Sequence, residues 1–183
     1  MGDLDIKYLD IFPSWLRTLG EDAQKTAALI NEPSLSENAR RAIVGGINYL
    51  FKSLDLIPDG IDDIGYLDDA FVLRVSADLA TREEISGVEP ENLEVLNRLA
   101  GECEVVREFL ADNYPRLESY VKGLYRGAAR GRYVSDILEN RETCSEFISD
   151  IREFGQSYRS PSFAREEKNL IKLQAFFDAK LPR

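Results

Sequence analysis

The stretch that decides the fold is residues 55–69, which read DLIPDGIDDIGYLDD. Pro58 cannot continue a helix, because it lacks an N–H group and its ring clashes with the carbonyl group of the preceding turn. Apolar residues recur at three- and four-residue spacing on both sides of this stretch, a pattern typical of amphipathic helices. The sequence therefore predicts two helices joined by this turn and packed as a short antiparallel hairpin.

The helix before the turn is predicted to start at Ser34 and to run through Leu54. Residues 34–37 read SLSE, a capping-box pattern in which the serine and glutamate side chains accept hydrogen bonds from free backbone N–H groups. Beyond Leu54, Pro58 is expected to end the helix.

The helix after the turn is predicted from about Tyr66 to Arg82. Asp62 or Asp63 is expected to cap it, because a short acidic side chain can accept hydrogen bonds from the first free N–H groups. Two further aspartates fall in its first turn, where the helix dipole favours a negative charge by about 0.3–1 kcal/mol.

The rest of the chain shows the same helical periodicity, and no long alternating pattern predicts a strand. We expect further helices over about 13–31, from Pro90 onwards, from Pro115 onwards, over 134–154 and over 163–177. The predicted fold class is all-α, a multi-helix bundle built around a helix–turn–helix hairpin. We expect a single helical domain over 1–183, with the hairpin at 36–82 and C-terminal helices at 90–183 packing on it.

The composition excludes several kinds of catalytic site. The chain has no histidine and only two cysteines, Cys103 and Cys144. A Ser-His-Asp triad, a Cys-His dyad and an HExxH zinc site all require histidine. Cys103 is in register with neighbouring apolar residues, so we expect it in the core rather than in a reactive site. The sequence thus leans towards a binding protein rather than an enzyme.

The net charge of −10 is concentrated in one part of the chain. Residues 53–112 contain sixteen Asp or Glu and four Arg, giving −12, whereas the remaining residues contain seventeen acids and nineteen bases, giving +2. Part of the surface should therefore be strongly negative, which disfavours nucleic acid as its partner, because phosphate binding needs clustered Lys and Arg. A solvated acidic surface that keeps the protein soluble is the simpler explanation.

The sequence contains no recognisable targeting or membrane-spanning segment. The N-terminus has no basic region followed by an apolar stretch. The longest charge-free apolar run near the middle, residues 42–51, is about half the ~20 residues that a spanning helix needs. We expect a soluble, cytoplasmic protein without a transmembrane segment.

Six aspartates lie within residues 55–69, among apolar residues that would hold the turn against the core. Like charges held this close repel each other, and burial increases the cost. Helix caps could relieve the repulsion, and so could pairing with Arg40, Arg41, the C-terminal region or another protein. A divalent cation is a further solution, because carboxylates suit Mg²⁺ and Ca²⁺. The candidate metal ligands are Asp55, Asp59, Asp68 and Asp69, and the residues expected to shape the turn are Pro58, Gly60 and Gly65.

The only basic cluster in the sequence is residues 122–133, KGLYRGAARGRY. Arg126, Arg130 and Arg132 are candidates for contact with an anion or a partner, since arginine and glycine-rich backbone can hold a phosphate. The simpler alternative is a helix C-terminus, where glycines end the helix and cations interact with the negative end of its dipole.

The strings DLIPD at residues 55–59 and GYLDD at residues 65–69 resemble the signature of the YkvA-like family, domain of unknown function 1232. The resemblance covers about residues 39–79 and implies the helical hairpin, but no established activity. Members of that family usually carry apolar residues and a second proline between the two strings. This chain has Gly60, Asp62 and Asp63 there, which disfavours any membrane role carried over from more apolar members.

Two functional hypotheses follow. The first is a helical protein–protein interaction or regulatory module, which binds a protein partner or a second copy of itself through its acidic turn. The alternative is a divalent-metal-binding protein or a metal-dependent hydrolase, in which Mg²⁺ or Ca²⁺ at the aspartates activates water or orients a phosphate. Peripheral membrane attachment is weaker, because anionic lipids would repel the negative surface.

Overall fold

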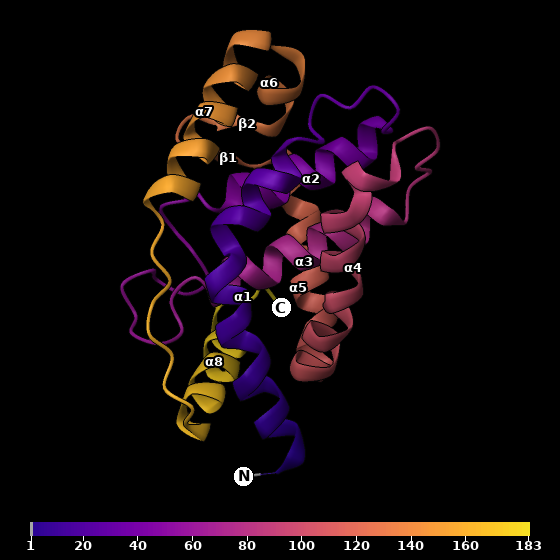
Figure 1. The fold of residues 1–183 in the computed structure, drawn as a ribbon. Helices are drawn as coiled ribbons and strands as arrows, with labels where there is room; N and C mark the ends of the chain where they lie inside the picture. Colours follow the sequence, from indigo (N-terminus) through magenta and orange to yellow (C-terminus); the bar gives the residue numbers. More distant parts are fainter. Residues whose placement is uncertain (1) are drawn as a thin grey trace.

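The computed structural model describes residues 2–183, and within them it contains eight α-helices, two short 3₁₀-helices and one two-stranded sheet (Figure 1). The α-helices are α1 (Asp3–Ala27), α2 (Glu37–Tyr49), α3 (Leu67–Thr81), α4 (Pro90–Leu110), α5 (Tyr114–Gly123), α6 (Val134–Glu139), α7 (Arg141–Ser157) and α8 (Glu167–Lys180). The 3₁₀-helices are η1 (Ala111–Asn113) and η2 (Leu124–Arg126), and the strands are β1 (Ala128–Ala129) and β2 (Arg132–Tyr133). The prediction of an all-α bundle built around a helical hairpin is confirmed.

Helix α3 lies at the centre of the bundle, with α2 packed along it as the other arm of the hairpin and α4 packed on another side (Figure 1). The side chains of α3 are buried on all faces of the helix, which explains why it is apolar nearly all round rather than amphipathic. Close approach of α2 and α3 depends on Gly46, because a Cβ atom there would lie 2.2 Å from the Ser76 hydroxyl oxygen. Buried apolar residues from α1 to α8 form one hydrophobic cluster.

The first helix is longer than predicted. It starts at Asp3 rather than near Pro13, and Pro13 lies inside it. A proline in a helix interior removes one backbone hydrogen bond. Residues on both sides of Pro13 are buried along one face of the helix, including Leu9, Phe12 and Leu16, and this packing keeps the helix continuous.

The second helix is shorter than predicted at both ends. Its N-cap is Ser36, whose hydroxyl accepts a hydrogen bond from the Ala39 N–H at 3.1 Å, so the expected cap at Ser34 is wrong. The helix ends at Tyr49. Just beyond it, the N–H groups of Leu50, Phe51 and Lys52 donate to the carbonyl group three residues earlier, at 3.1, 3.1 and 3.0 Å, which tightens the chain into turns. Pro58 therefore lies well beyond the helix end and does not terminate it.

The C-terminal half departs from the prediction at three places. The helix expected over 134–154 is two helices, because Asn140 is extended and its side chain accepts hydrogen bonds from the N–H groups of Glu142 and Thr143, both at 3.0 Å. The basic segment forms a β-hairpin rather than only a helix end, and its turn places Arg130 and Gly131 at positive φ. The last helix begins at Glu167 instead of near residue 163.

A buried charge network that the sequence analysis missed joins α1, α3 and α4. Arg74 is fully buried, donates from Nε to Glu102 at 2.8 Å and stacks over the Trp15 ring at 3.8 Å. Asp22, also buried, lies 4.0 Å from Arg74 and pairs with Arg98. The Arg74 guanidinium is therefore surrounded by carboxylates and an aromatic face, which offset the cost of its burial.

Replacing Arg74 should destabilise the protein strongly. Arg74→Met should lower the free energy of unfolding by about 3–5 kcal/mol, because it leaves buried carboxylate charge without its main partner. Arg98→Met should cost about 1 kcal/mol or less, since the Arg98 side chain is 42% exposed. Urea unfolding followed by circular dichroism measures both, and similar losses for the two variants would contradict the assigned role of Arg74.

Candidate functional site

The turn between α2 and α3 carries the four carboxylates that the sequence singled out, and they lie close enough to influence one another's pKa values. Asp68 and Asp69 are the second and third residues of α3 and are 0% and 2% exposed. Asp55 is half-buried at the start of the turn, and Asp59 lies at its surface. The negative charges of Asp55, Asp59 and Asp68 all raise the pKa of Asp69, which places the four side chains in one cluster. We call these four residues the carboxylate cluster.

Tyr49, the last residue of α2, connects both helices to the turn. Its hydroxyl donates to Asp68 Oδ2 at 2.5 Å and accepts from the Leu56 N–H at 2.7 Å. The Ile57 N–H donates to the same Asp68 oxygen at 3.0 Å. Asp68 thus closes the turn by accepting bonds from a side chain and from the backbone, a role that the sequence analysis did not assign. The signal for this role in the sequence was a tyrosine near the end of the helix, a few residues before the run of aspartates.

The predicted cap of the third helix is wrong. The N-cap position belongs to Tyr66, which has φ of 66° and makes no side-chain cap bond. Asp63 turns away from the helix and accepts hydrogen bonds from the Ala164 N–H at 3.4 Å and from Asn169 at 3.2 Å. The Tyr66 hydroxyl donates instead to Asp59, across the mouth of the turn.

Burial raises the pKa values of the carboxylate cluster. The pKa of Asp55 rises to about 7, first through desolvation and then through the charges of Asp68 and Asp59. The pKa of Asp69 is raised well above its ordinary value by desolvation and by the neighbouring carboxylates. Desolvation also raises the pKa of Asp68, although its bonds from Tyr49 and the Ile57 N–H work in the opposite direction. The folded cluster therefore retains protons at a pH where free aspartates are ionised.

Several carboxylate oxygens of the cluster have no hydrogen-bond donor within residues 2–183, and its aspartates form no ion pairs there. Asp55 Oδ1, Asp68 Oδ1 and Asp69 Oδ2 are inaccessible and have no hydrogen-bond partner among residues 2–183. None of the six aspartates in residues 55–69 forms an ion pair with a described Lys or Arg. Arg41, one expected partner, pairs with Glu37 instead. Such unpaired buried oxygens are uncommon in folded proteins and call for a physical explanation.

The geometry gives no support to the metal-binding alternative. Within residues 2–183, no group of three or more Asp, Glu, Cys or His side chains is arranged so that it could hold a metal ion. A site for Mg²⁺ or Ca²⁺ needs several oxygens converging on one point. In this turn, one oxygen of Asp68 is occupied by Tyr49 and the backbone, which removes it from such a set.

The residues expected to shape the turn have unequal roles. A Cβ atom on Gly65 would lie 2.4 Å from the Asp59 carbonyl oxygen and 2.9 Å from that of Ile61, so the chain passes itself too closely there for any side chain. A Cβ atom on Gly60 would meet nothing within 4 Å. Pro58 is exposed, and its carbonyl oxygen accepts from the Ile61 N–H at 2.9 Å.

The predicted anion contacts lie elsewhere in the fold and are partly occupied. Arg130 and Arg132, on the β-hairpin, both reach Asp150 of α7, at 3.4 and 2.6 Å. The guanidinium group of Arg130 also lies over the Phe51 ring, 4.7 Å from its centroid. Arg126 is exposed. The β-hairpin arginines thus hold α7 against the turn after α2, a structural role that the sequence did not predict.

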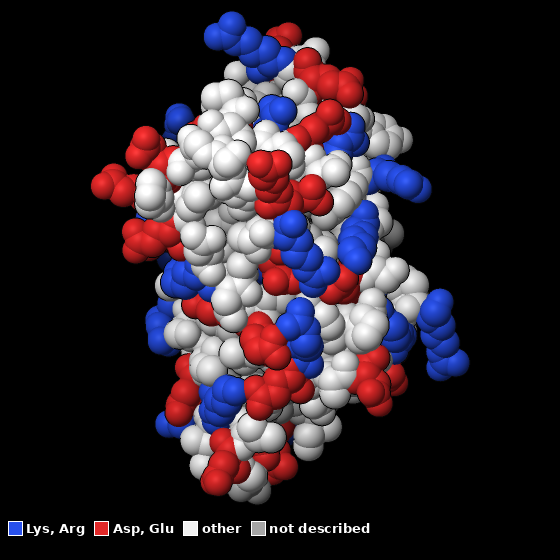
Figure 2. Space-filling view, turned by 90° about the vertical axis from the view of Figure 1, so that its right-hand side faces the viewer, with Lys and Arg blue, Asp and Glu red and all other residues white. Residues whose placement is uncertain are grey.

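The acidic excess of residues 53–112 does not produce a uniformly negative face over α4. Figure 2 shows the side that lies on the right in Figure 1, and there acidic and basic side chains are interspersed. Ion pairs between helices account for part of this mixing, such as Arg82 with Glu118 at 3.0 Å and Arg107 with Asp78 at 3.8 Å.

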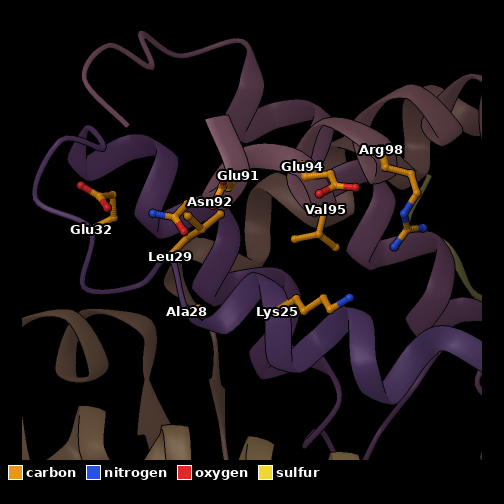
Figure 3. A pocket seen from close by; sticks show the side chains of 9 residues that line it. All are labelled: Lys25, Ala28, Leu29, Glu32, Glu91, Asn92, Glu94, Val95 and Arg98. Atoms are coloured by element: carbon orange, nitrogen blue, oxygen red, sulfur yellow. The ribbon is translucent and has the colours of Figure 1, made fainter. Parts of the chain in front are cut away.

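A separate surface pocket of about 370 Å³ lies between the end of α1 and the start of α4 (Figure 3). Lys25 and Arg98 lie at one end, and Glu32 lies at the other. Both cations already have acidic partners, since Lys25 pairs with Glu21 and Arg98 with Asp22. The pocket therefore offers no unpaired charge comparable with that of the carboxylate cluster.

Comparison with known families points to the same turn. Residues 39–74 match the model of the family described as "Protein of unknown function (DUF1232)". The resemblance to the YkvA-like family is thus confirmed for this segment, which comprises 36 of the 183 residues. No curated protein and no solved structure matches the chain. The matched segment contains α2 from residue 39 onwards, the turn and the first half of α3, and so includes the whole carboxylate cluster.

The protonated cluster predicts a specific dependence of stability on pH. The folded-state pKa values are raised, so the folded protein binds more protons than the unfolded chain, and the free energy of unfolding should fall as pH rises from about 4 to 8. Asp69→Asn should stabilise the protein at pH 8 by about 1–2 kcal/mol, roughly one pKa unit of relieved repulsion, and by less at pH 4. Denaturant titrations across this range measure the effect. Asp112→Asn, at an exposed aspartate in η1, is the control, and an identical pH slope in wild type and Asp69→Asn would refute the assignment.

Substitution by alanine should have a large effect on stability at Gly65 and almost none at Gly60. Gly65→Ala should lower the free energy of unfolding by about 1–3 kcal/mol or more, because the added methyl group collides with backbone oxygens that cannot move independently. Gly60→Ala should change it by about 0.5 kcal/mol or less, since the site is open. Thermal and urea unfolding compare the two, and a tolerated Gly65→Ala would show that the turn is looser than described.

Proposed function

We propose that the protein is a helical interaction module that binds a basic segment of a protein partner at the carboxylate cluster. The observation that carries this proposal is that the exposed Asp59 and the half-buried Asp55 form no ion pair with a described Lys or Arg. An arginine or lysine from a partner would give these two carboxylates the ion pair that they do not form within residues 2–183. Asp55 and Asp59 lie at the outer side of the cluster and would make the first contact.

An apolar groove beside the cluster extends the proposed contact surface. It has a volume of about 560 Å³ and is lined by residues that include Lys52, Pro115, Tyr120 and Leu124. Lys52 donates to the Tyr120 hydroxyl at 3.2 Å, and the charges of Asp68, Asp55 and Asp69 raise the pKa of Tyr120. The charged residues of the groove lining are all basic, namely Lys52, Arg116 and Arg183. The basic residue of the partner segment would therefore contact Asp55 and Asp59, and only a neighbouring apolar residue would lie in the groove.

The absence of histidine and the burial of both cysteine thiols favour binding over catalysis. The sequence has no histidine, and both cysteines are buried and free. Burial raises the pKa of the Cys103 thiol to about 11 and also raises that of Cys144, which keeps both in the unreactive thiol form at neutral pH. Among residues 2–183, none of the helices combines the length and apolar character needed to cross a membrane. A cytoplasmic location remains part of this proposal.

A basic peptide tests the proposed site. A labelled peptide that alternates Arg and Leu should bind the wild-type protein, and the affinity should fall as salt concentration rises, because ion pairs drive the association. Asp55→Asn combined with Asp59→Asn should weaken binding about tenfold, which corresponds to about 1.4 kcal/mol. Fluorescence anisotropy measures the affinity, with Asp112→Asn as a control that removes an exposed charge outside the cluster.

The outcomes separate the competing interpretations. Equal binding by wild type and the double variant, or equal weakening by Asp112→Asn, would reject the cluster as a docking site. Analytical ultracentrifugation of the protein alone shows whether the partner is a second copy. Thermal stabilisation by Mg²⁺ or Ca²⁺ that disappears in Asp69→Asn would instead support the metal-binding alternative.

A further inference from the structure

Arg40 occupies an unusual position near the start of α2, far from the carboxylate cluster. It lines a pocket of about 470 Å³ formed by the turn after α1, by α2 and by the junction of α6 and α7. Helix α2 packs against α6, near the top of the view in Figure 1. Neither of the two functional hypotheses from the sequence makes use of it.

The Arg40 side chain is partly buried but forms no ion pair with a described residue. Its Nε atom is inaccessible and has no hydrogen-bond partner among residues 2–183. The adjacent Arg41, in contrast, donates from Nε to Glu37 at 2.8 Å. Partial burial of a guanidinium group without a partner is unfavourable, so a complementary anion would stabilise it.

The rest of the pocket wall suits a small anion with an organic part. Arg141, the first residue of α7, brings a second guanidinium group, which forms no ion pair within residues 2–183. Ile30 and Ile137 provide apolar wall, and Glu139 is the one acidic side chain in the lining. With two arginines and one glutamate, the lining is net positive in a protein whose net charge is −10.

We propose that this pocket binds a small organic anion whose carboxylate or phosphate group is held by Arg40 and Arg141. The planar guanidinium group presents paired N–H donors that match the oxygens of such groups, which gives strong charge-assisted hydrogen bonds. Because the Nε atom of Arg40 is inaccessible, the ligand would contact the terminal nitrogens of the guanidinium group. The polar groups of Asn31 and Ser145 in the wall set the orientation of the organic part.

Binding of inorganic phosphate and of succinate tests the proposal, and the two probes distinguish a phosphate from a carboxylate ligand. Isothermal titration calorimetry in phosphate-free buffer should show saturable binding of at least one probe to the wild-type protein. Arg40→Gln should weaken that binding about tenfold or more, consistent with loss of a charged hydrogen-bond donor. Arg41→Gln is the matched control, because it removes the same charge one residue away from an arginine that already has a partner.

Three outcomes overturn the proposal. They are the absence of saturable binding by either probe, unchanged affinity in Arg40→Gln, and an equal loss in Arg41→Gln, which would reflect overall charge only. Circular dichroism establishes that each variant is folded. If Arg40→Gln does not fold, the exposed Arg141 replaces it, and unchanged affinity in Arg141→Gln then counts against the site.

Discussion

Burial of two adjacent carboxylates at the first turn of α3 is the constraint on which the surrounding structure depends. Asp68 and Asp69 enter the core with almost no exposed surface, in a helix whose other buried residues are apolar except for Arg74 and Ser76. Removing a carboxylate from water costs several kcal/mol unless hydrogen bonds, opposite charges or protons compensate. The N-terminal end of the helix dipole contributes only about 0.3–1 kcal/mol for each charge, so other groups must supply the rest.

The compensation that the structure provides also determines the shape of the hairpin. The Tyr49 hydroxyl and the Ile57 N–H both donate to Asp68, so the end of α2 and the turn are held against the start of α3. Asp69 has no comparable side-chain donor. Its raised pKa allows it to retain a proton, which is the remaining way for the chain to reduce its charge. Helix α2 thus connects two regions whose charged side chains form no ion pairs, the pocket at Arg40 and the carboxylate cluster. The nine residues from Arg40 to Tyr49 correspond to a rise of about 14 Å along the helix axis.

Much of the hairpin could be predicted because its signals are local. Helical periodicity, the turn at residues 58–65 and the grouping of Asp55, Asp59, Asp68 and Asp69 all follow from sequence spacing alone. The start of α1 and the end of α2 could not be predicted in this way, because tertiary packing keeps Pro13 inside a helix, and Tyr49 bonds to the turn before Pro58 is reached. Propensity and proline rules describe an isolated chain, and packing overrides them.

The errors at the candidate site share a physical cause, which is dependence on contacts between residues far apart in sequence. Asp63 was expected to cap α3, but Asn169 of α8 and the backbone at Ala164 occupy its carboxylate. Arg130 and Arg132 were candidates for contact with an anion or a partner, but both form ion pairs with Asp150 of α7. No periodicity in the sequence encodes such partners, and an arginine on an apolar helix, such as Arg74, was the only local signal for the second buried network.

The two buried charge clusters are compensated in different ways. At Arg74, the fold brings Asp22 and Glu102 from two other helices to within 4.0 and 2.7 Å, so the chain can neutralise a buried charge when stability alone requires it. At the carboxylate cluster, within the same hydrophobic core, it brings no cation to Asp68 or Asp69 among residues 2–183. Raised pKa values are the compensation within the chain, because bound protons neutralise carboxylates that form no ion pair. In the proposed function, a cation of the partner would replace such protons at the outer carboxylates, so binding would be linked to proton release.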